Sequence, residues 1–403
     1  MIVKEKEMKR VLFVHPNNFL KGGQGENVRV LELLHLFKEI GYEVDLFSFE
    51  NFTPDSTFLD FADDNSDNKI RELYLYDYAN NQMGYKRIQS FYTRLKNKLK
   101  RMVKSKVKGE YLQNWVRPGM KQLFEQVIKS GEYDVVAIFY TYLSELLVNL
   151  PFTGKKVYFM EDSMFIQQYS WDKGRIPNMT LGKLMDEEIE RLKEFDEYFC
   201  ISYDEKIIYE KITNQKMYFL PHLLPEGNKR VETPVAKRKW DVFFIGFNNP
   251  YNVEGLKWFI EEVYPYLDKK LNVLLVGSAT DCIKEEYDNV TIIRYIPNLE
   301  EVYSDVKVAI CPMFNGTGMK IKVVESMAKG IPIVCNERGV DGFPDKMMTG
   351  CLVTQNPEEF ASYINQLNQD TEFYAKRVKK MNDYYMSIFD REHYKKLLES
   401  VLG

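Results

Sequence analysis

Histidine and cysteine are scarce in this 403-residue chain, which contains four of the former and five of the latter. No two histidines have the spacing of a metal-ligand pair, so we expect no metal ion held by the protein. The cysteines are odd in number and form no C-x-x-C pair. Three of them, Cys200, Cys311 and Cys335, lie in apolar strand-like runs, which indicates reduced core thiols in a cytosolic protein rather than a disulfide framework.

Long apolar runs are also missing, and none approaches the 18 residues expected of a transmembrane helix. The charged start, residues 1–10, has no apolar signal-peptide core. A net charge of −4 gives no reason to expect nucleic acid as a partner. The glycines after the first strand-like run are spaced wrongly for a tight G-x-G-x-x-G turn, which argues against a nicotinamide or flavin enzyme.

What the chain does contain is an alternation of strand and helix signals, in two sets. The length suits two domains, and the alternation predicts parallel sheets with helices on both faces. A polar stretch without periodicity, 226–239, is interpreted as the linker between the sets. The expected strands are 11–15, 43–49, 73–76, 135–140, 157–160, 198–201 and 217–220 in the first set, and 241–245, 272–276, 290–293, 308–311 and 331–335 in the second.

The most informative run spans residues 316–332 and reads G-T-G-M-K-I-K-V-V-E-S-M-A-K-G-I-P. A glycine-bearing turn at a helix start presents unpaired N–H groups and the positive end of the helix dipole, which together favour a phosphate. Lys320 and Lys322 add positive charge in the first turn, and Glu325 lies one turn deeper on roughly the same face. Taken alone, a glycine turn is more often an ordinary loop than a phosphate site, and a Lys/Glu pair on a helix is more often part of a solvent-exposed face. The whole run is more specific and indicates a nucleotide diphosphate with its ribose.

This run resembles the donor-site helix of group 1 (family 4) glycosyltransferases of the GT-B fold, whose members read roughly G-x-G-x-K-x-K-x-x-E-A-x-A-x-G-x-P. The resemblance implies that Lys322 contacts the donor diphosphate and Glu325 the ribose of a nucleotide sugar. Electrostatic stabilisation of the leaving diphosphate would come from Lys322, Lys320 and the loop Gly316 to Gly318. Thr317 stands where many members have a second glutamate, although a subset has small residues there.

Further segments carry the same resemblance. Gly22 and Gly23 match a glycine pair that lies near the donor diphosphate in the family, with a loop that binds nothing as the alternative. Gly246 ends a strand before a helix of the form N-V-x-x-L-x-W-F, although the arginine that many relatives have in this loop is absent. Arg294 and Tyr295 match the turn that contacts the nucleobase. The relatives have glycine where this chain has Arg294, so the sequence does not identify the nucleobase of the donor.

Glu161 and Asp162 directly follow the expected strand 157–160 and therefore lie at its carboxyl end. Carboxylates at this edge can orient an acceptor hydroxyl or take its proton. A structural cap for the next segment is an equally good interpretation. His15, at the end of the first strand, is expected to be a buried, hydrogen-bonded side chain.

Positive charge is concentrated in residues 86–121, which contain twelve cations and one anion. Apolar residues recur there every three or four positions, which predicts an amphipathic helix with basic flanks. These cations would also hold the chain at an anionic membrane surface. A lipid-linked or otherwise anionic acceptor is the sharper hypothesis, and a solvated helix face is the alternative. In the resembled family this part of the first domain lies beside the acceptor site.

We therefore expect an α/β fold of two Rossmann-like domains facing each other across a cleft, with a C-terminal helix crossing back to the first domain. The expected parts are an acceptor-side domain at 1–225, the linker, a nucleotide-sugar domain at 240–380, and the returning helix at 381–403. The expected enzyme is a cytoplasmic glycosyltransferase, peripheral on the inner membrane face, with no permanently bound cofactor, and retention is implied by the resemblance. A sugar-nucleotide epimerase of the same fold and an inactive nucleotide-binding partner subunit remain as alternatives.

Overall fold

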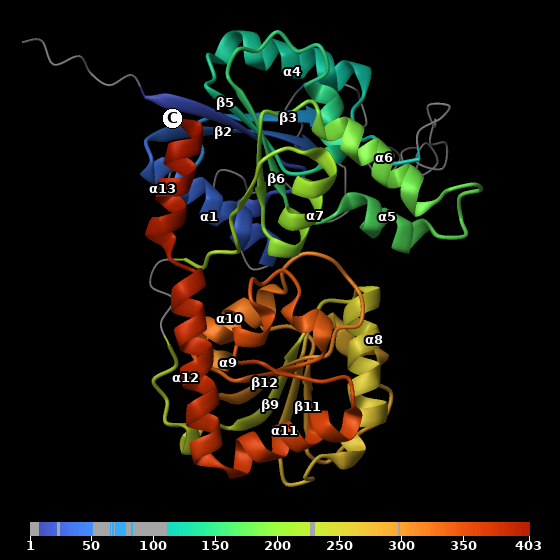
Figure 1. Cartoon of the computed structure of the whole chain (residues 1–403), viewed down its shortest axis with the longest axis vertical. Helices are drawn as coiled ribbons and strands as arrows, with labels where there is room; N and C mark the ends of the chain where they lie inside the picture. Colours follow the sequence, from blue (N-terminus) through green and yellow to red (C-terminus); the bar gives the residue numbers. More distant parts are fainter. Residues whose placement is uncertain are drawn as a thin grey trace, which may run out of the picture. The chain divides into compact units, whose positions relative to one another are not determined.

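The computed structural model describes residues 8–21, 25–50, 65, 67, 69–77, 82–83, 111–225, 230–296 and 299–403. The chain divides into two compact units. Unit 1 comprises Met1–Ile201, Glu205–Leu220 and Arg391–Gly403, and unit 2 comprises Ser202–Asp204 and Pro221–Asp390. Each unit is built around its own sheet with helices packed against it (Figure 1).

The sheet in the described part of unit 1 has eight strands in the order β4-β3-β2-β1-β5-β6-β7-β8. Neighbouring strands are parallel, apart from the antiparallel pair β3 and β4. The strands are β1 Lys9–Val14, β2 Tyr42–Glu50, β3 Leu73–Asp77, β4 Gln82–Met83, β5 Val135–Ile138, β6 Lys155–Met160, β7 Glu197–Cys200 and β8 Met217–Phe219. The helices of this unit are α1 Gly25–Glu39, α4 Pro118–Gly131, α5 Met164–Asp172, α6 Leu181–Leu192, α7 Tyr203–Thr213 and α13 Arg391–Leu402, of which α7 begins in residues assigned to unit 2.

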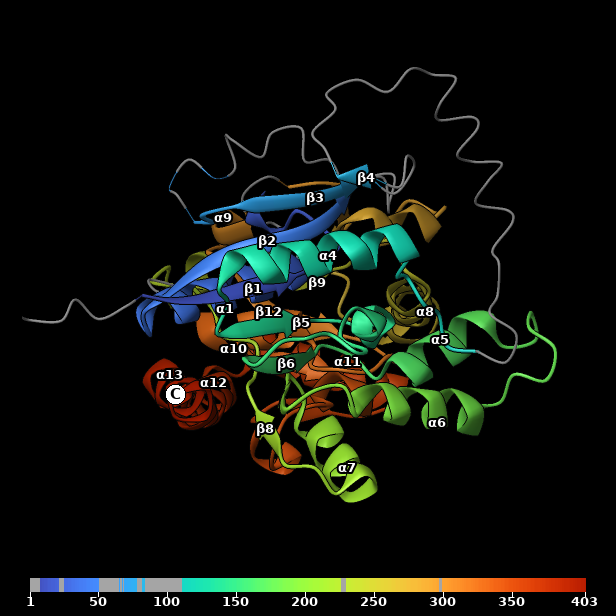
Figure 2. The same ribbon diagram turned by 90° about the horizontal axis from the view of Figure 1, so that it is seen from above.

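Helices cover both faces of this sheet, which explains the continuous apolar runs of its strands. On one face, the ring of Phe13 lies 5.2 Å from that of Phe37 in α1. On the other, Phe47 lies 5.2 Å from Phe124 in α4, and α4 runs along the sheet (Figure 2). Each of these fully buried phenylalanines contributes on the order of 2–3 kcal/mol by removing its ring from water.

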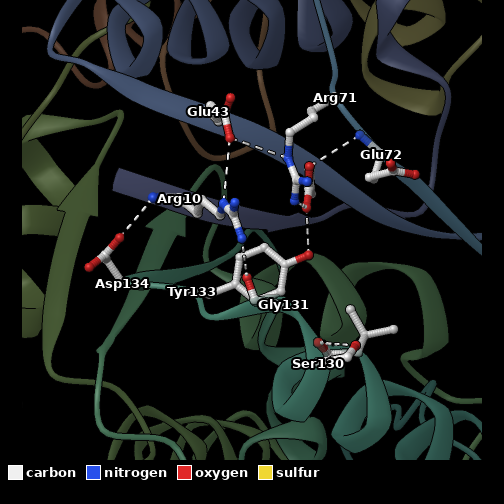
Figure 3. Close-up of polar contacts among 10 residues, drawn as sticks. Arg10, Glu43, Arg71, Glu72, Ser130, Gly131, Tyr133 and Asp134 are labelled. Carbon is white, nitrogen blue, oxygen red and sulfur yellow. Dashed lines mark hydrogen bonds and ion pairs between the residues drawn. The ribbon is translucent and has the colours of Figure 1, made fainter. Parts of the chain in front are cut away.

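Charged side chains close the amino edge of the same sheet (Figure 3). Asp45 of β2 is 1% exposed, pairs with Arg71, and accepts a hydrogen bond of 2.6 Å from the hydroxyl of Tyr133. Glu43 lies 3.4 Å from the guanidinium groups of both Arg10 and Arg71. Since these residues lie at or just before the starts of β1, β2, β3 and β5, ion pairs stabilise the amino edge of the sheet.

The sheet in the described part of unit 2 has six parallel strands in the order β11-β10-β9-β12-β13-β14. They are β9 Trp240–Ile245, β10 Val273–Val276, β11 Val290–Ile293, β12 Val306–Cys311, β13 Ile333–Cys335 and β14 Leu352–Val353. The helices are α8 Pro250–Trp258, α9 Leu299–Tyr303, α10 Ile321–Lys329, α11 Pro357–Gln369 and α12 Thr371–Ile388. Phe244 belongs to the core under α8 and α11, whereas Phe243 lies on the opposite face, 5.4 Å from Tyr303 of α9.

The C-terminal region, where a returning helix is expected at 381–403, is divided between two helices. Helix α12 ends at Ile388 and α13 begins at Arg391. Asp390 stands immediately before α13, where aspartate is a favoured cap, and this stop-and-restart signal is hidden by the continuous helical spacing. Helix α13 belongs to unit 1, because Arg391 pairs with Glu32 at 2.8 Å and with Glu39 at 2.6 Å. The helices of the described residues are all too short or too polar to span a lipid bilayer.

Candidate functional site

The strand order of unit 2 reverses direction between β9 and β12. Open parallel sheets bind ligands at the carboxyl ends of their strands, at such a switch point. Gly246 directly follows β9, and the loop 312–320 follows β12 and leads into α10. Two segments that the sequence singled out, about 70 residues apart, therefore meet at the expected binding edge.

The loop before α10 is shaped by its glycines and by Lys320. Gly316 has a φ of +104° and Gly318 a φ of +70°, conformations that residues with a side chain rarely adopt. Lys320 is 7% exposed, and its ammonium group donates to the carbonyl oxygens of Thr317 at 3.0 Å and Gly318 at 3.1 Å. The charge of Lys320 therefore lies inside the loop, where it also holds the backbone in place.

Lys322 lies in the first turn of α10 and is half-buried. Its Nζ donates a hydrogen bond of 2.8 Å to Oδ1 of Asn252 and lies 5.0 Å from the ring centroid of Phe244. Burial lowers the pKa of this ammonium group, and the charge of Lys320 lowers it further. Lys322 forms no ion pair with any carboxylate of the described residues. This cation, held by a neutral amide at a helix N-terminus, is placed to accept an anion.

Asn252 is the partner that sequence reasoning missed. It is 6% exposed in the first turn of α8, where Oδ1 of Asn249 accepts from its backbone N–H at 2.8 Å. Its own amide donates to the carbonyl oxygen of Phe247 at 3.0 Å. A Cβ atom on Gly246 would lie 3.0 Å from Cγ of Asn252, so the absence of a side chain at this position leaves room for the asparagine. The sequence signal that could have identified Asn252 was a polar residue in the first turn of the helix that follows β9.

Glu325 follows Lys322 by three residues in α10. Its Oε2 accepts a hydrogen bond of 2.9 Å from the hydroxyl of Tyr303, which is 2% exposed. Burial raises the pKa of Glu325, although the hydrogen bond from Tyr303 opposes the rise. Because only one carboxylate oxygen is engaged in this bond, the other can accept from a ligand hydroxyl.

The other residues predicted to contact the donor have no described contact with Lys322. Arg294 pairs with Asp281 at 2.9 Å, and Tyr295 is 77% exposed. Both follow β11, which β10 separates from β9, so the structure does not bring them to Lys322. Gly22 and Gly23 lie outside the described residues.

Unit 1 has its own switch point, between β1 and β5. His15 follows β1 and is 0% exposed. Its Nδ1 lies 3.1 Å from the carbonyl oxygen of Asn17, and its Nε2 lies 3.4 Å from Oε1 of Glu26. The same oxygen of Glu26 accepts a hydrogen bond from the hydroxyl of Tyr140, which follows β5. His15 is therefore the buried, bonded histidine expected from the sequence, whereas Glu26 and Tyr140 were missed.

The carboxylates at this edge differ in environment. Burial would raise the pKa of Glu26, but His15 and then Tyr140 lower it overall. Burial raises the pKa of Glu161, while Arg29 opposes the rise with its Nε 3.5 Å from the carboxylate. Asp162 is half-buried and accepts from the side-chain amide of Gln167 at 3.2 Å. The arrangement resembles acid–base sites in which neighbouring carboxylates have different proton affinities.

Residues 239–370 match the family model described as glycosyl transferases group 1. Among curated proteins, the chain is 27% identical over 231 residues to an uncharacterized 44.6 kDa protein in the cps region of Klebsiella pneumoniae. That match covers 51% of this chain and 55% of the relative, so the chain spans about half the length of the relative it matches.

Solved structures resemble the whole chain. One of them is a TarM mutant from S. aureus that was solved with fondaparinux, alpha-GlcNAc-glycerol and UDP. Its TM-score is 0.67 at 10% identity, and the match covers 97% of this chain and 99% of the TarM chain. Sucrose-phosphate synthase from Thermosynechococcus elongatus has a TM-score of 0.65 at 14% identity, covering 98% of both chains. The structure of Anabaena Alr3699/HepE with UDP has a TM-score of 0.65 at 13% identity, and the match covers 98% of this chain and 99% of the Anabaena chain. At these identities the likeness shows the fold, and the expected two-domain α/β fold is confirmed. The family match covers residues 239–370, about a third of the chain, and the solved structures share the two-domain fold of the whole chain.

Proposed function

We propose that the protein is a glycosyltransferase that moves a sugar from a nucleotide diphosphate sugar, bound by unit 2, to a hydroxyl acceptor bound by unit 1. The observation that carries the proposal is the half-buried ammonium group of Lys322, which has a neutral amide as its hydrogen-bond partner at the N-terminus of α10. A diphosphate would place negative charge directly against this ammonium group, which forms no ion pair with a carboxylate of the described residues.

Catalysis on this view is mainly electrostatic. Charge accumulates on the departing diphosphate as the bond to the sugar breaks, and fixed positive groups stabilise that charge most in the transition state. Lys322, Lys320 and the loop at Gly316 to Gly318 are proposed to supply them, and Glu325 to accept from the ribose. Retention of configuration at the transferred sugar is proposed from the family resemblance.

The acceptor is proposed to bind at the carboxyl edge of the unit 1 sheet. Glu26 is 38% exposed there and has a lowered pKa, so it is ionised at neutral pH and able to orient a hydroxyl group. Asp162 is retained as the proposed base, because Glu161 is held by Arg29 and its side chain is only 9% exposed. We assign the reaction to the assembly of a surface polysaccharide, glycolipid or glycoprotein glycan. The location of the Klebsiella pneumoniae relative in a cps region supports the first of these.

We further propose that the enzyme works at the cytoplasmic face of a membrane, drawn there by the cations of 86–121. This proposal rests on the sequence, since residues 86–110 lie outside the described part of the chain.

A nucleotide panel tests the donor site. Because relatives of the same fold were solved with UDP, UDP is the first probe, followed by GDP, ADP and their sugars. A ligand at about 100 times its dissociation constant adds about 2.7 kcal/mol to the free energy of unfolding, so the cognate nucleotide should raise the melting temperature measurably. The proposal is wrong if no nucleotide does so.

Turnover separates sugar transfer from the two alternatives. Transfer predicts that nucleotide release from the cognate donor sugar rises when the acceptor glycan is added. An epimerase would interconvert sugar nucleotides without an acceptor, and an inactive partner subunit would bind the donor and release nothing.

A further inference from the structure

A hollow in unit 2 lies along one face of α11. Its volume is about 510 Å³, which is in the size range of small-ligand pockets. It is lined by a stripe of side chains on α11 and by Tyr266, from the short helix Tyr264–Tyr266 that precedes β10. Figure 1 shows α11 at the end of unit 2 away from α10. This α11 hollow is therefore separate from the residues proposed to bind the nucleotide.

The stripe on α11 is polar along its whole length. Its members recur at intervals of three and four residues, so they share one face of the helix. They are Glu358, Ser362, Asn365, Gln366 and Gln369. The side chains of Ser362, Gln366 and Gln369 have no hydrogen-bond partner in the described chain. The hollow thus presents a hydroxyl group and two carboxamides that are free to bind a ligand.

Tyr266 adds an aromatic ring to the same hollow and is 52% exposed. The backbone around it is fixed to α11 by the side-chain amide of Asn365. This amide donates to the carbonyl oxygen of Tyr266 at 3.2 Å, and its oxygen accepts from the backbone N–H of Asp268 at 3.1 Å. A ring on a backbone that is already held in place costs little ordering when a ligand binds.

Carboxylates make the hollow unfavourable for an anion. Glu358 and, to a lesser degree, Glu262 raise the pKa of the Tyr266 hydroxyl. Asp370 also lines the hollow, where its Oδ1 caps α12 by accepting the backbone N–H groups of residues 372 and 373 at 3.0 Å and 2.9 Å. A phosphate or an acidic sugar would meet these charges without a compensating cation.

Lysine and arginine are missing from the lining of the hollow in the described chain. Helix α11 contains neither, although the whole chain has 55 of them. Lys269, in the turn after Tyr266, donates to the carbonyl oxygen of Tyr264 at 2.5 Å, with its ammonium group 3.5 Å from the centroid of that ring. Its charge is therefore directed at Tyr264, and the chemistry of the hollow favours a neutral ligand rich in hydroxyl groups.

We infer that the α11 hollow is a second carbohydrate site, which binds a neutral oligosaccharide. Each carboxamide of Gln366 and Gln369 offers donors and an acceptor, a combination that matches adjacent sugar hydroxyls. The ring of Tyr266 packs against the apolar C–H face of a pyranose. The stripe from Glu358 to Gln369 covers about 17 Å of helix, so it contacts several sugar rings rather than one. The inference does not rest on the proposed sugar transfer.

Calorimetric titration of hexasaccharides into the full-length chain tests this site. The neutral probes are cellohexaose, maltohexaose and laminarihexaose, and a hyaluronan hexasaccharide is the acidic counterpart. We expect at least one neutral probe to bind and the acidic probe to bind more weakly. Tyr266→Ala should weaken the neutral probe about tenfold through loss of the ring contact, whereas Tyr266→Trp should preserve binding.

A double variant tests the carboxamides separately. Gln366→Ala with Gln369→Ala should weaken the neutral probe about tenfold, the loss expected for two neutral hydrogen bonds. Gln215→Ala alters an exposed glutamine of unit 1 and is the matched control, which should bind as the wild type does.

Three results overturn the inference: no neutral probe binds at millimolar concentration, the acidic probe binds more tightly, or Tyr266→Ala and the glutamine variant bind as well as the wild type. The third result would place the sugar elsewhere on the chain. UDP titrated into the same proteins should bind equally to all of them, so a failure of the nucleotide site is seen independently of this one. If Tyr266→Ala does not fold, the glutamine variant decides.

Discussion

The ammonium group of Lys322 and the side-chain oxygen of Asn252 are joined by a hydrogen bond of 2.8 Å, across the point where the strand order of unit 2 reverses. Lys322 belongs to α10 after β12, and Asn252 to α8 after β9. The bond positions a cation at the binding edge without neutralising it.

If Lys322 binds the diphosphate as proposed, its lowered pKa should make nucleotide binding sensitive to alkaline pH. Only the protonated lysine attracts the diphosphate, so UDP affinity should fall as the pH rises from neutrality towards the ordinary lysine value of 10.5. Lys322→Arg keeps its charge over this range. We predict that the ratio of wild-type to Lys322→Arg affinity, from calorimetric titrations at several pH values, decreases with rising pH. A constant ratio would contradict the proposed contact, and taking the ratio cancels any titration of UDP itself.

Glu325 should distinguish a nucleotide that has ribose hydroxyls from one that lacks them. If Glu325 accepts from the ribose, Glu325→Ala should weaken UDP binding by about 1.5–3 kcal/mol, the range for hydrogen bonds to charged groups. The same change should leave the affinity for 2′,3′-dideoxy-UDP almost unaltered. Tyr303→Phe keeps the carboxylate and should have a smaller effect. Equal losses for both nucleotides in Glu325→Ala would show that Glu325 supports the site without touching the ribose.

Gly255 of α8 allows this helix to lie close to the loop 312–320, which follows β12. A Cβ atom there would lie 1.5 Å from the carbonyl oxygen of Pro312, the first residue after β12. Gly255→Ala should therefore lower the free energy of unfolding by on the order of 1–3 kcal/mol and weaken UDP binding. Gly182→Ala is the matched control, because a Cβ at that position of α6 meets nothing within 4 Å, and it should change stability by less than about 1 kcal/mol. Urea unfolding of the two variants compares them, and equal stabilities would refute the packing argument.

Glu188 should make the stability of the chain depend on pH. Its burial raises the pKa from 4.5 to about 7, despite the opposing hydrogen bonds from the backbone of Phe165 and other donors. Because the folded state favours the protonated form, the contribution of this group is full below pH 4.5 and is lost as the pH rises through about 7. From pH 5 to pH 8 the wild type should lose up to about 3 kcal/mol of unfolding free energy relative to Glu188→Gln. If the free energies of unfolding of the two proteins change with pH in the same way, the raised pKa of Glu188 is contradicted.

The strands and the donor helix could be predicted because their signals are local. The parallel strands β9 and β12 are apolar runs buried on both faces, and the run from Gly316 to Gly330 combines turn, helix start and helix stop in adjacent residues. Helix α10 begins at Ile321 and ends at Lys329, with Gly330 at a φ of +70° as its stop. The stop of the helix was therefore visible without knowledge of the tertiary structure, whereas Lys320, expected in its first turn, immediately precedes the helix.

The partners of these residues could not be predicted, because they depend on strand order. Asn252 reaches Lys322 only because β9 and β12 are neighbours, and Tyr140 reaches Glu26 only because β5 pairs with β1. Strand order is not encoded in the period of apolar residues. The roles assigned to Glu161, Asp162, Arg294 and Tyr295 remain predictions.

Calorimetric titration of UDP, GDP and ADP into the wild type and Lys322→Ala tests the central claim most directly. We predict that the wild type binds at least one of these nucleotides, and that Lys322→Ala binds it at least about tenfold more weakly, since a charge-assisted contact is lost. Binding of equal affinity by the two proteins, or no binding of any nucleotide by the wild type, would contradict a diphosphate site at the N-terminus of α10.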